Sequence, residues 1–385
     1  MCVSITSHMP SEPSKTRARR GASRKPWPRD SRPAAIRVPW RGMRIAVVFD
    51  TPYSDWSPEQ HAEQMAREHA LGDEFEPDME YQVAQALIDN GHEVLLVGVH
   101  DDVRDATTRL AEWKPDVVFN ATESFDENYD LDYLIPAMLE SQGYRYTGAP
   151  PLSLLVTRNK SMSKKILAFH GIKVPGFRTY RLGERPQGEV DLQTPLIVKP
   201  MGADGSEGIA RASIVRDARA LARRVAFIHK RFGKPAIAEE YVEGRELYLT
   251  MVGNGESVQI LPPVELVFAG DASRPESRIQ TKRMKWDLAY RKRHGIKTVY
   301  ARRMSKVAEE RLEHVCRTAF RALWLRDYAR IDVRLADDDE IWFLEANANP
   351  YLSFGHNSAE AAHKAGMHYE AFIQRIVDEA MARDA

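Results

Sequence analysis

The chain has 385 residues, which is too long for one ordinary hydrophobic core, so we expect two or three packed units. Lys and Arg number 55 and so do Asp and Glu, so overall charge gives no support for binding to nucleic acid or to an anionic membrane. Cys2 and Cys316 are too few for a disulfide framework and lack metal-ligand spacing, which fits a reducing cytoplasm. No apolar run approaches the ~20 residues that span a bilayer, so we expect a soluble, cytoplasmic protein.

Residues 1–42 differ from the rest of the chain in composition. They hold ten Lys or Arg, two acids and several prolines, and they show no apolar periodicity. This composition predicts a disordered basic tail. An organelle transit peptide is also basic and poor in acids, but no amphipathic helix is evident here. Because the sequence "MRIAVVFD" from Met43 looks like the first strand of a domain, it stays open whether residues 1–42 are a real part of the protein.

Residues 43–151 are predicted to form the first folded unit. Apolar strands are expected at 44–50, 93–99 and 116–120, with helices within 77–92 and 130–143. Strands that alternate with helices indicate a parallel sheet with right-handed crossovers, so this unit resembles a Rossmann domain. No G-x-G-x-x-G sequence follows the first strand, and a dinucleotide site is therefore not favoured.

Residues 152–250 are predicted to form a second unit. It opens with a helix in "RNKSMSKKILAFHGIKVPGF", which Gly171 and Pro175 end. A strand then leads to Lys199 and to the Gly-rich turn "GADGSEG". One further strand is expected over 235–253, and its carboxylates are Glu239, Glu240 and Glu246.

Residues 251–385 are predicted to form the last unit. Apolar periodicity is lost over 265–304, and the part from 278 to 303 holds ten Lys or Arg and one acid, Asp287. A long basic loop inside a domain is unusual and often functional. A long amphipathic helix is expected over 305–325, then two strands joined by an acidic turn within 328–350, and one last helix over 358–382.

The last two strands predict a cation site. In "RIDV" Arg330 and Asp332 share one face of a strand, and the turn "ADDDE" lets "IWFLEAN" return antiparallel with Glu345 and Asn347. We expect Asp332 and Glu345 on adjacent strands, with Asn347 nearby. Two carboxylates and an amide oxygen suit magnesium better than zinc. The alternative is a polar strand end that faces solvent.

Two further groups of residues suggest a nucleotide. Lys199 and the Gly-rich turn after it offer a charge and backbone N–H groups to a polyphosphate, although no Walker sequence is present and such a turn can be only a turn. Lys160 by itself reads as a solvated helix charge. The segment "EEYVEGRE" offers carboxylates to ribose hydroxyls and an extended backbone to adenine, and a charged edge strand explains it equally well.

The order of these motifs resembles the ATP-grasp superfamily and, within it, the D-alanine–D-alanine ligase family. The matching sequences are "NKSMSKKILAFHGIKVP", "IVKPMGADGSEGI", "EEYVEGREL", "MKWD", "RIDV" and "LEANANP", which together cover roughly residues 116–355. The resemblance implies an α/β protein that is α+β in its ATP-binding part. It would be an ATP-grasp fold with a Rossmann-like N-terminal domain over 43–151, a small subdomain over 152–250 and a C-terminal subdomain over 251–385 with a basic lid loop at 265–304.

The resemblance also implies roles for individual residues. Lys160 and Lys199 would bind the ATP phosphates, and the loop from about 203 to 208, with Gly205 and Ser206, would close over them. The adenine pocket would contain Glu239, Tyr241 and Val242, and the ribose would be held by Glu246. Lys285 would reach the γ-phosphate, and Arg330 would face an acyl phosphate and the tetrahedral oxyanion. Two magnesium ions, or manganese in their place, would be held by Asp332, Glu345 and Asn347.

The expected reaction is the ATP-dependent joining of a carboxylate and an amine through an acyl phosphate. Its partners would be small molecules, with no nucleic acid and no membrane, and the family resemblance also suggests a homodimer. Catalysis would rest on positioning and electrostatics, so no nucleophilic side chain is needed.

The acceptor half of the chain departs from the family. The family's "GGxSxE" is replaced by "FDTPYSDWSPEQ", its "HGxxGEDG" by "ATESFDENYD" and its "NTxPGMT" by "NANPYLSFGHNS". The first Ser of the family's "GSS" aligns with Gly205, and the Tyr after the loop lysine is Trp286. We therefore expect an amino acid or a peptide-like metabolite as substrate. The alternatives are a D-alanine–D-alanine ligase of cell-wall synthesis and a non-catalytic nucleotide-binding module.

Overall fold

The computed structural model describes residues 42–51, 78–188, 190–202, 206–268, 279 and 293–383. The chain divides into two compact units, Met1–Val38 and Pro39–Ala385, and the first lies outside the described residues with almost all of the predicted tail. Within the part of the chain that is described, no helix is long and apolar enough to cross a membrane.

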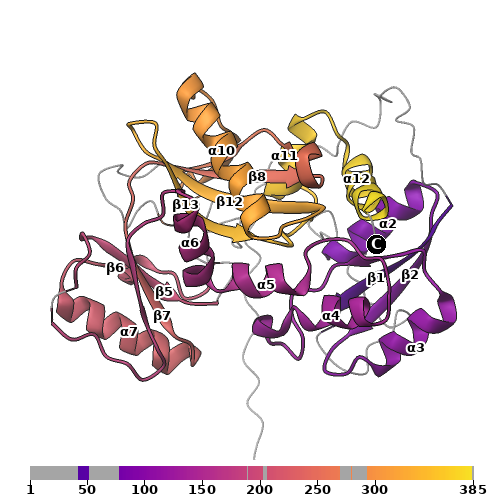
Figure 1. Ribbon diagram of the computed structural model, residues 1–385, viewed down its shortest axis with the longest axis horizontal. Helices are drawn as coiled ribbons and strands as arrows, with labels where there is room; N and C mark the ends of the chain where they lie inside the picture. The colour runs from indigo at the N-terminus through magenta and orange to yellow at the C-terminus, as the bar shows by residue number, and fades with distance from the viewer. Residues whose placement is uncertain are drawn as a thin grey trace, which may run out of the picture. The chain divides into compact units, whose positions relative to one another are not determined.

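The first folded part is a parallel three-stranded sheet with helices on both faces (Figure 1). Helices α2 and α12 pack on one face, and α3 and α4 pack on the other. The sequence forms this sheet because its strands are continuous apolar runs, which suit burial on both sides. The sheet order is β2-β1-β3, and the bounds are β1 (Arg44–Asp50), β2 (Glu93–Val99), β3 (Val117–Asn120), α2 (Met79–Asp89), α3 (Arg104–Trp113), α4 (Leu134–Ser141) and α12 (Tyr369–Ala382). The predicted parallel sheet is confirmed.

A four-stranded antiparallel sheet follows, in the order β4-β7-β5-β6. Its apolar face is covered by the amphipathic helix α7, which Asp217 caps at its N-terminus. These elements are β4 (Phe177–Tyr180), β5 (Leu196–Pro200), β6 (Ile214–Val215), β7 (Ala236–Glu240) and α7 (Ala218–Phe232).

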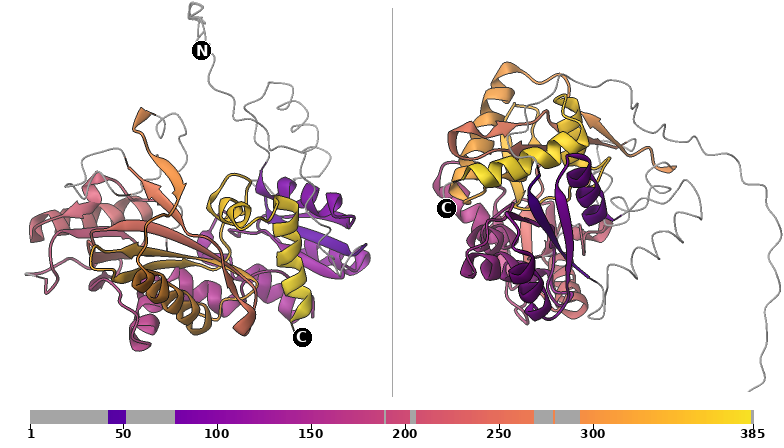
Figure 2. Two further views of the ribbon diagram at one scale, coloured as in Figure 1. Left: turned by 90° about the horizontal axis from the view of Figure 1, so that it is seen from above. Right: turned by 90° about the vertical axis from the view of Figure 1, so that its right-hand side faces the viewer.

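The third sheet has six strands in the order β11-β10-β8-β12-β13, with β9 paired to β8. Helices α5, α6 and α10 pack on one face, and α11 packs against β8 and β10 (Figure 2). The strands are β8 (Arg245–Val252), β9 (Gln259–Ile260), β10 (Val264–Val267), β11 (Lys297–Tyr300), β12 (Tyr328–Leu335) and β13 (Ile341–Asn347). The helices are α5 (Pro151–Arg158), α6 (Lys160–Phe169), α10 (Lys306–Ala322) and α11 (Asn357–Lys364), and three short 3₁₀ turns are η1 (Tyr129–Leu131), η2 (Arg211–Ser213) and η3 (Gly255–Ser257).

The prediction of a single strand over 235–253 is wrong. It is two strands, because β7 belongs to the four-stranded sheet and β8 to the six-stranded sheet. Residues 241–244 link them, and Gly244 adopts a φ of +137° with its Cα so close to β12 that an added Cβ would lie 2.2 Å from the Leu335 carbonyl oxygen. Only glycine fits this position, and the chain changes sheet there.

The predicted subdomain boundaries do not follow the sheets. Residue 250 falls inside β8, and helices α5 and α6 pack on the six-stranded sheet instead of the four-stranded one. We therefore propose that the small subdomain comprises about residues 177–240, and that the preceding helices belong with the last unit.

Two other predicted elements are corrected. The ends of the loop predicted over 265–304 are strands β10 and β11, which pair antiparallel, while residues 269–278 and 280–292 lie outside the described part. The single helix predicted over 358–382 is α11 followed by α12, because the chain turns at Gly366, whose φ is +85°.

The predicted pairing of the last two strands is confirmed. β12 and β13 run antiparallel, with Asp332 opposite Glu345 and Arg330 opposite Asn347. A register shift follows between Asp332 and Val333. On its other side β12 pairs with β8 without interruption, which places Asp332 opposite Tyr248. The central strand thus fixes the polar side chains that this hairpin presents.

Replacing Gly244 tests the linker between the two sheets. Gly244→Ala should lower the free energy of unfolding by roughly 2–4 kcal/mol, because the methyl group overlaps the β12 backbone and φ is positive. Gly233→Ala is the matched control, since Gly233 also has a positive φ of +63° but no atom lies within 4 Å of an added Cβ. The control should cost about 1 kcal/mol in the same urea denaturation experiment. Equal losses in the two variants would contradict this account of the linker.

Candidate functional site

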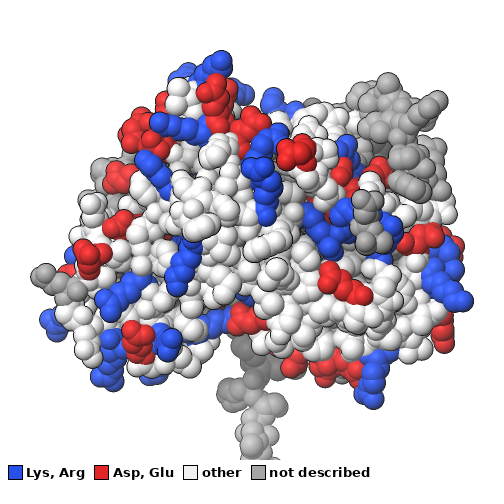
Figure 3. Space-filling view, in the orientation of Figure 1, with Lys and Arg blue, Asp and Glu red and all other residues white. Residues whose placement is uncertain are grey.

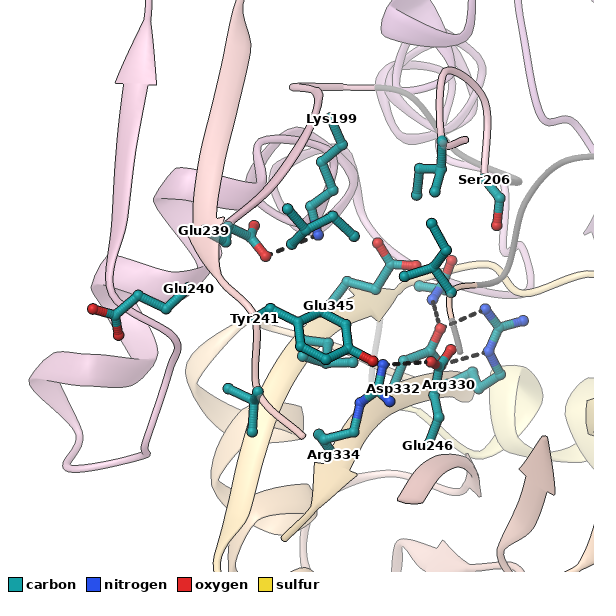
Figure 4. A pocket seen from close by; sticks show the side chains of 16 residues that line it. Lys199, Ser206, Glu239, Glu240, Tyr241, Glu246, Arg330, Asp332, Arg334 and Glu345 are labelled. Atoms are coloured by element: carbon teal, nitrogen blue, oxygen red, sulfur yellow. Dashed lines mark hydrogen bonds and ion pairs between the residues drawn. The ribbon is translucent and has the colours of Figure 1, made fainter. Parts of the chain in front are cut away.

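A pocket lies where the four-stranded and six-stranded sheets face each other (Figure 4). Its empty volume is about 800 Å³, part of which is open to solvent. That size suits a small-molecule or nucleotide ligand. The predicted site residues that line it are Lys199, Ser206, Glu239, Tyr241, Val242, Glu246, Arg330, Asp332, Glu345 and Asn347.

Two lysines meet a buried carboxylate at one end of the pocket. Lys199 Nζ lies 3.0 Å from Glu239 Oε2, and Lys164 Nζ lies 3.7 Å from Glu239 Oε1. Burial raises the pKa of Glu239, but the two ammonium groups outweigh burial, and the pKa is lowered. The carboxylate is therefore ionised, and it stabilises positive charge at this end of the pocket.

Lys164 is a member of this cluster that the sequence prediction missed. Its side chain is fully buried, and its Nζ donates a 2.6 Å hydrogen bond to the Leu344 carbonyl oxygen next to Glu345. Burial lowers the pKa of Lys164 to about 8, against the opposing attraction of Glu239. Lys164 therefore ties α6 to both β7 and β13. A lysine four residues after Lys160 on a helix places both on one face, and this spacing could have identified it.

Neighbouring carboxylates on β7 point in opposite directions, as strand alternation requires (Figure 4). Glu239 faces the lysines. Glu240 points out of this cluster and accepts hydrogen bonds from the backbone N–H groups of Gly176, at 3.2 Å, and Gln193, at 2.8 Å. Glu240 therefore holds the loops beside β7, and Glu239 carries the charge inside the pocket.

Arg330 and Asp332 form a bidentate ion pair on β12. Arg330 Nε donates to Asp332 Oδ1 at 2.7 Å and Arg330 Nη2 donates to Oδ2 at 2.8 Å, while Asn347 Nδ2 lies 3.3 Å from Oδ2. Burial raises the pKa of Asp332 to about 6 although Arg330 opposes it, and Glu345 and Glu246 add to the rise. The side chains of the predicted cation site are therefore brought together.

Lys160 lies beside Glu345, the β13 carboxylate of the predicted cation site. Its Nζ lies 3.4 Å from Glu345 Oε2, and the Lys160 side chain is 5% exposed. The predicted phosphate lysine and a predicted metal ligand are thus direct neighbours. Lys160 is the first residue of α6, and the Asn159 side chain caps this helix by accepting from the Met162 N–H group, which sets where the lysine emerges.

The donor set fits a hard divalent cation. Asp332 and Glu345 lie opposite each other on paired strands, and Asn347 adds an amide group next to Asp332. Carboxylate and amide oxygens with room for phosphate oxygens and water are what Mg²⁺ prefers. A carboxylate has about four acceptor positions, so Asp332 can keep its contact with Arg330 while it also binds a cation.

The linker end of the pocket holds Glu246, Tyr241, Val242 and a second arginine that the sequence prediction missed. Arg334 Nη2 lies 2.8 Å from Glu246 Oε2, and the Tyr248 hydroxyl donates to Glu246 Oε1 at 2.7 Å. The pocket therefore has separate ends, with lysines at one and this linker cluster at the other. Arg334 follows Asp332 by two residues on β12, so the two side chains point to the same face of the sheet. The alternation of side chains along a strand could have identified Arg334 from the sequence.

The sequence of this chain is similar to those of known proteins. The family described as D-ala D-ala ligase C-terminus matches residues 166–378, more than half of the chain. The chain belongs to this family. Its relatives include the uncharacterized protein y4sG of Sinorhizobium fredii, 34% identical over 78% of this chain and 87% of that protein. A D-alanine–D-alanine ligase of Cupriavidus taiwanensis is 29% identical over 65% of this chain and 72% of the ligase.

Solved structures of the D-alanine–D-alanine ligase family share the fold. The Bacillus anthracis D-alanine–D-alanine ligase crystallised with ATP aligns with a TM-score of 0.64 at 20% identity, covering 88% of this chain and 98% of the ligase. The VanG D-Ala:D-Ser ligase from Enterococcus faecalis aligns with a TM-score of 0.62 at 17% identity, covering 88% of this chain and all of that one. The predicted ATP-grasp fold with its Rossmann-like N-terminal part is therefore confirmed.

Two residues that the family resemblance assigned lie outside the described part of the chain. These are Gly205, in the Gly-rich turn, and Lys285, in the predicted lid loop. Ser206 is described, with a φ of +63°, and lines the pocket.

The segment after β13, which departs from the family pattern, packs on α2 of the N-terminal part. The Leu352 N–H group approaches Met79 Sδ at 3.1 Å, and the Phe354 N–H group donates to Gln82 Oε1 at 2.7 Å. This segment begins only a few residues after Asn347, and its hydrogen bonds connect the end of β13 to α2.

Four carboxylates gather near that segment. Asp50 accepts from the Glu123 N–H group at 2.7 Å and from the Ser124 hydroxyl at 2.9 Å, where β1 and β3 end. Burial raises the pKa of Glu80 to about 7, and the charges of Asp78, Asp50 and Glu123 add to the rise. A positive group would relieve the repulsion among these carboxylates.

Surface charges are mixed on the face that Figure 3 shows, where Lys and Arg alternate with Asp and Glu over the described residues. No large field of one sign covers that part of the face, in keeping with the equal totals of acids and bases.

The raised pKa of Glu80 predicts how stability depends on pH. Below about pH 4.5 the group is protonated in both states, and between about 4.5 and 7 the unfolded chain loses the proton first. The free energy of unfolding should therefore fall as pH rises, and Glu80→Gln should remove this loss. The variant should gain about 1–2 kcal/mol relative to the wild type between pH 5 and pH 8 in urea denaturation.

The control for this test is Glu370→Gln, because Glu370 is exposed and also lies in the first turn of a helix, α12. It should follow the wild-type pH dependence. A Glu80→Gln curve that runs parallel to the wild type from pH 5 to pH 8 would show that the assigned shift is wrong.

Proposed function

We propose that the protein is an ATP-dependent carboxylate–amine ligase that forms an amide bond through an acyl phosphate and releases ADP and phosphate. The observation that carries this proposal is the pocket itself. Asp332 and Glu345 lie opposite each other beside Lys160, while Lys199 lies on Glu239 in the same pocket. Such a set of cations and oxygen donors suits a metal-bound triphosphate, and membership of the D-alanine–D-alanine ligase family supports the same chemistry.

The lysines would bind the ATP phosphates. Lys199 and Lys160 each contact a carboxylate at 3.0 and 3.4 Å, so their charge is held in place before a phosphate arrives. The Ser206 side of the Gly-rich turn would approach the same phosphates, and Lys285 from the lid loop would reach the γ-phosphate. Lys164 is fully buried and would hold β7 and β13 in position without touching the nucleotide.

The linker between the sheets would bind the nucleoside. Tyr241 and Val242 line the pocket and would contact the adenine, the latter through its backbone, with Glu239 beside them. Glu246 would accept hydrogen bonds from the ribose hydroxyls, because an ionised carboxylate is a pure acceptor.

Asp332, Glu345 and Asn347 would hold one or two Mg²⁺ or Mn²⁺ ions. When bound, the metal neutralises charge on the phosphates during phosphoryl transfer. Arg330 lies 2.7 Å from Asp332 on the same strand and would face the acyl phosphate and the oxyanion that forms when the amine attacks. A fixed guanidinium stabilises negative charge as it develops without needing to reorganise.

The second substrate would be an amine of an amino acid or a peptide-like metabolite. The carboxylates of Asp50, Glu80 and Glu123 support this, because an ammonium group would be attracted to them. The departures from the family pattern around residues 49–60, 121–130 and 347–358 argue for a substrate pair other than two D-alanines. Ligation of D-alanine to D-alanine is the second candidate, because relatives at 28–29% identity are named for that reaction.

A substrate screen tests the proposal. The full chain with ATP and Mg²⁺ should release phosphate only when a suitable carboxylate and amine are both present, and the product mass should equal the sum of the two minus one water. Pairs of amino acids and dipeptides, with D-alanine alone included, make up the screen. Phosphate release with D-alanine alone would establish the second candidate, and failure of the chain to bind Mg²⁺-ATP would refute both.

Loss of the metal ligands should stop ATP turnover while the fold is kept. Asp332→Asn and Glu345→Gln should each reduce turnover on the order of 100-fold or more, and both should weaken Mg²⁺-dependent ATP binding measured by calorimetry. Asp338→Asn is the control, since Asp338 is exposed in the turn between β12 and β13. Circular dichroism would verify folding. Unchanged turnover in a folded Glu345→Gln variant would refute the metal assignment.

A further inference from the structure

Arg334 connects the linker and the nucleoside end of the pocket through three contacts. Its Nη2 lies 2.8 Å from Glu246 Oε2, its Nη1 donates to the Gly244 carbonyl oxygen at 3.2 Å, and its guanidinium carbon lies 5.5 Å from the centre of the Tyr241 ring. Figure 4 shows Arg334 between Tyr241 and Glu246. One side chain therefore touches the ring proposed to contact the base, the carboxylate proposed to hold the ribose and the backbone between them.

The position of Glu246 is fixed from both sides. Arg334 and Glu246 lie directly opposite each other on β12 and β8, and the Tyr248 hydroxyl holds the second carboxylate oxygen at 2.7 Å. The side chains of Arg334 and Glu246 are only 7% and 12% exposed. Because a carboxylate has about four acceptor positions, Glu246 still has two available to hydroxyl groups that enter the pocket.

Arg334 also retains a donor. Its Nε–H group is buried and has no acceptor among the described residues, although Arg334 lines the pocket. Because this nitrogen has almost no accessible surface, Arg334 acts through its contacts with Glu246 and the Gly244 carbonyl oxygen. The lysines proposed to bind phosphate contact Glu239 and Glu345, whereas Arg334 contacts Glu246. Arg334 therefore belongs to the nucleoside end of the pocket and not to the phosphate end.

We infer that Arg334 is the positioning residue for nucleoside recognition: it sets the Glu246 carboxylate for the ribose hydroxyls and links that contact to the linker beneath Tyr241. This inference rests on the proposed function, because it assumes that the nucleotide is ATP with its ribose at Glu246. Lysine cannot replace arginine here, since only the planar fork reaches both Glu246 and the Gly244 carbonyl. A residue that merely stabilised the fold would affect all nucleotides equally.

The test compares ATP with 2′-deoxyATP and 3′-deoxyATP, each bound with Mg²⁺ to the full chain and measured by calorimetry. The wild type should bind at least one deoxynucleotide about fivefold more weakly than ATP, the loss expected for one hydrogen bond. In Arg334→Met this ratio should fall below about twofold while ATP binding itself weakens. Arg334→Lys should also lose most of the discrimination, which keeps the test valid if the methionine variant does not fold.

A double-mutant cycle and a matched control sharpen the result. Adding Arg334→Met to Glu246→Gln should change the ratio little further, because both act on the same contact. Arg245→Met is the control, since Arg245 also holds a glutamate, Glu265, at 2.6 Å in the same sheet but does not line the pocket. It should lower the melting temperature and leave the deoxynucleotide ratios as in the wild type.

The outcomes separate this inference from the proposed function. ATP binding by the wild type with ratios that Arg334→Lys and Arg334→Met leave unchanged would overturn the role of Arg334 alone. Equal binding of ATP and both deoxynucleotides by the wild type would also overturn it, because Glu246 would then not hold the ribose. Absence of Mg²⁺-ATP binding by the folded wild type would instead refute the proposed function, and the inference with it.

Discussion

The pocket depends on the pairing of one central strand, β12. This strand hydrogen-bonds to β8 on one side and to β13 on the other, so neither neighbour can shift without breaking a ladder. Because side chains alternate, Arg330, Asp332 and Arg334 project from the same face at two-residue intervals. Arg330 and Asp332 bind each other along β12, and Arg334 binds Glu246 on the paired strand β8. A slip by one residue would turn all three polar groups into the apolar core. Packing and chemistry thus constrain the same strand.

The second constraint is that the buried lysines and glutamates of the pocket must balance each other's charge. Lys164, Lys199 and Glu239 form one cluster, and Lys160 with Glu345 forms another. Buried charges are tolerated when they are paired and hydrogen-bonded, and removing one partner leaves the other exposed to the full cost of desolvation. The buried charges that line the pocket are therefore balanced without a ligand. This explains why α6, which carries two of the lysines, packs on the six-stranded sheet instead of following the small sheet that comes next in sequence.

Sequence patterns correctly predicted the elements that depend mainly on residues close together in the chain. The apolar runs of β1 and β2 and the turn between β12 and β13 place those strands correctly, and alternation then brings Asp332 opposite Glu345. The end of β7 and the start of β8 near Gly244 were missed because the alternation of side chains continues through both strands. Only the close approach of β12 shows why glycine is required there. Lys164 and Arg334 were missed for a related reason. A lysine on a helix or an arginine on a strand is usually solvated, and only tertiary packing buries these two.

The contact between Lys160 and Glu345 has a consequence for how ligands would enter. On the proposed function, a phosphate that attracts Lys160 weakens the attraction between Lys160 and Glu345, so the positive charge beside this carboxylate is reduced. A divalent ion bound to the same phosphates supplies it at once, whereas a free anion such as sulfate brings none. The pair would thus favour the binding of nucleotide and cation together over the binding of a simple anion, a thermodynamic coupling between two ligands to which the 3.4 Å contact contributes.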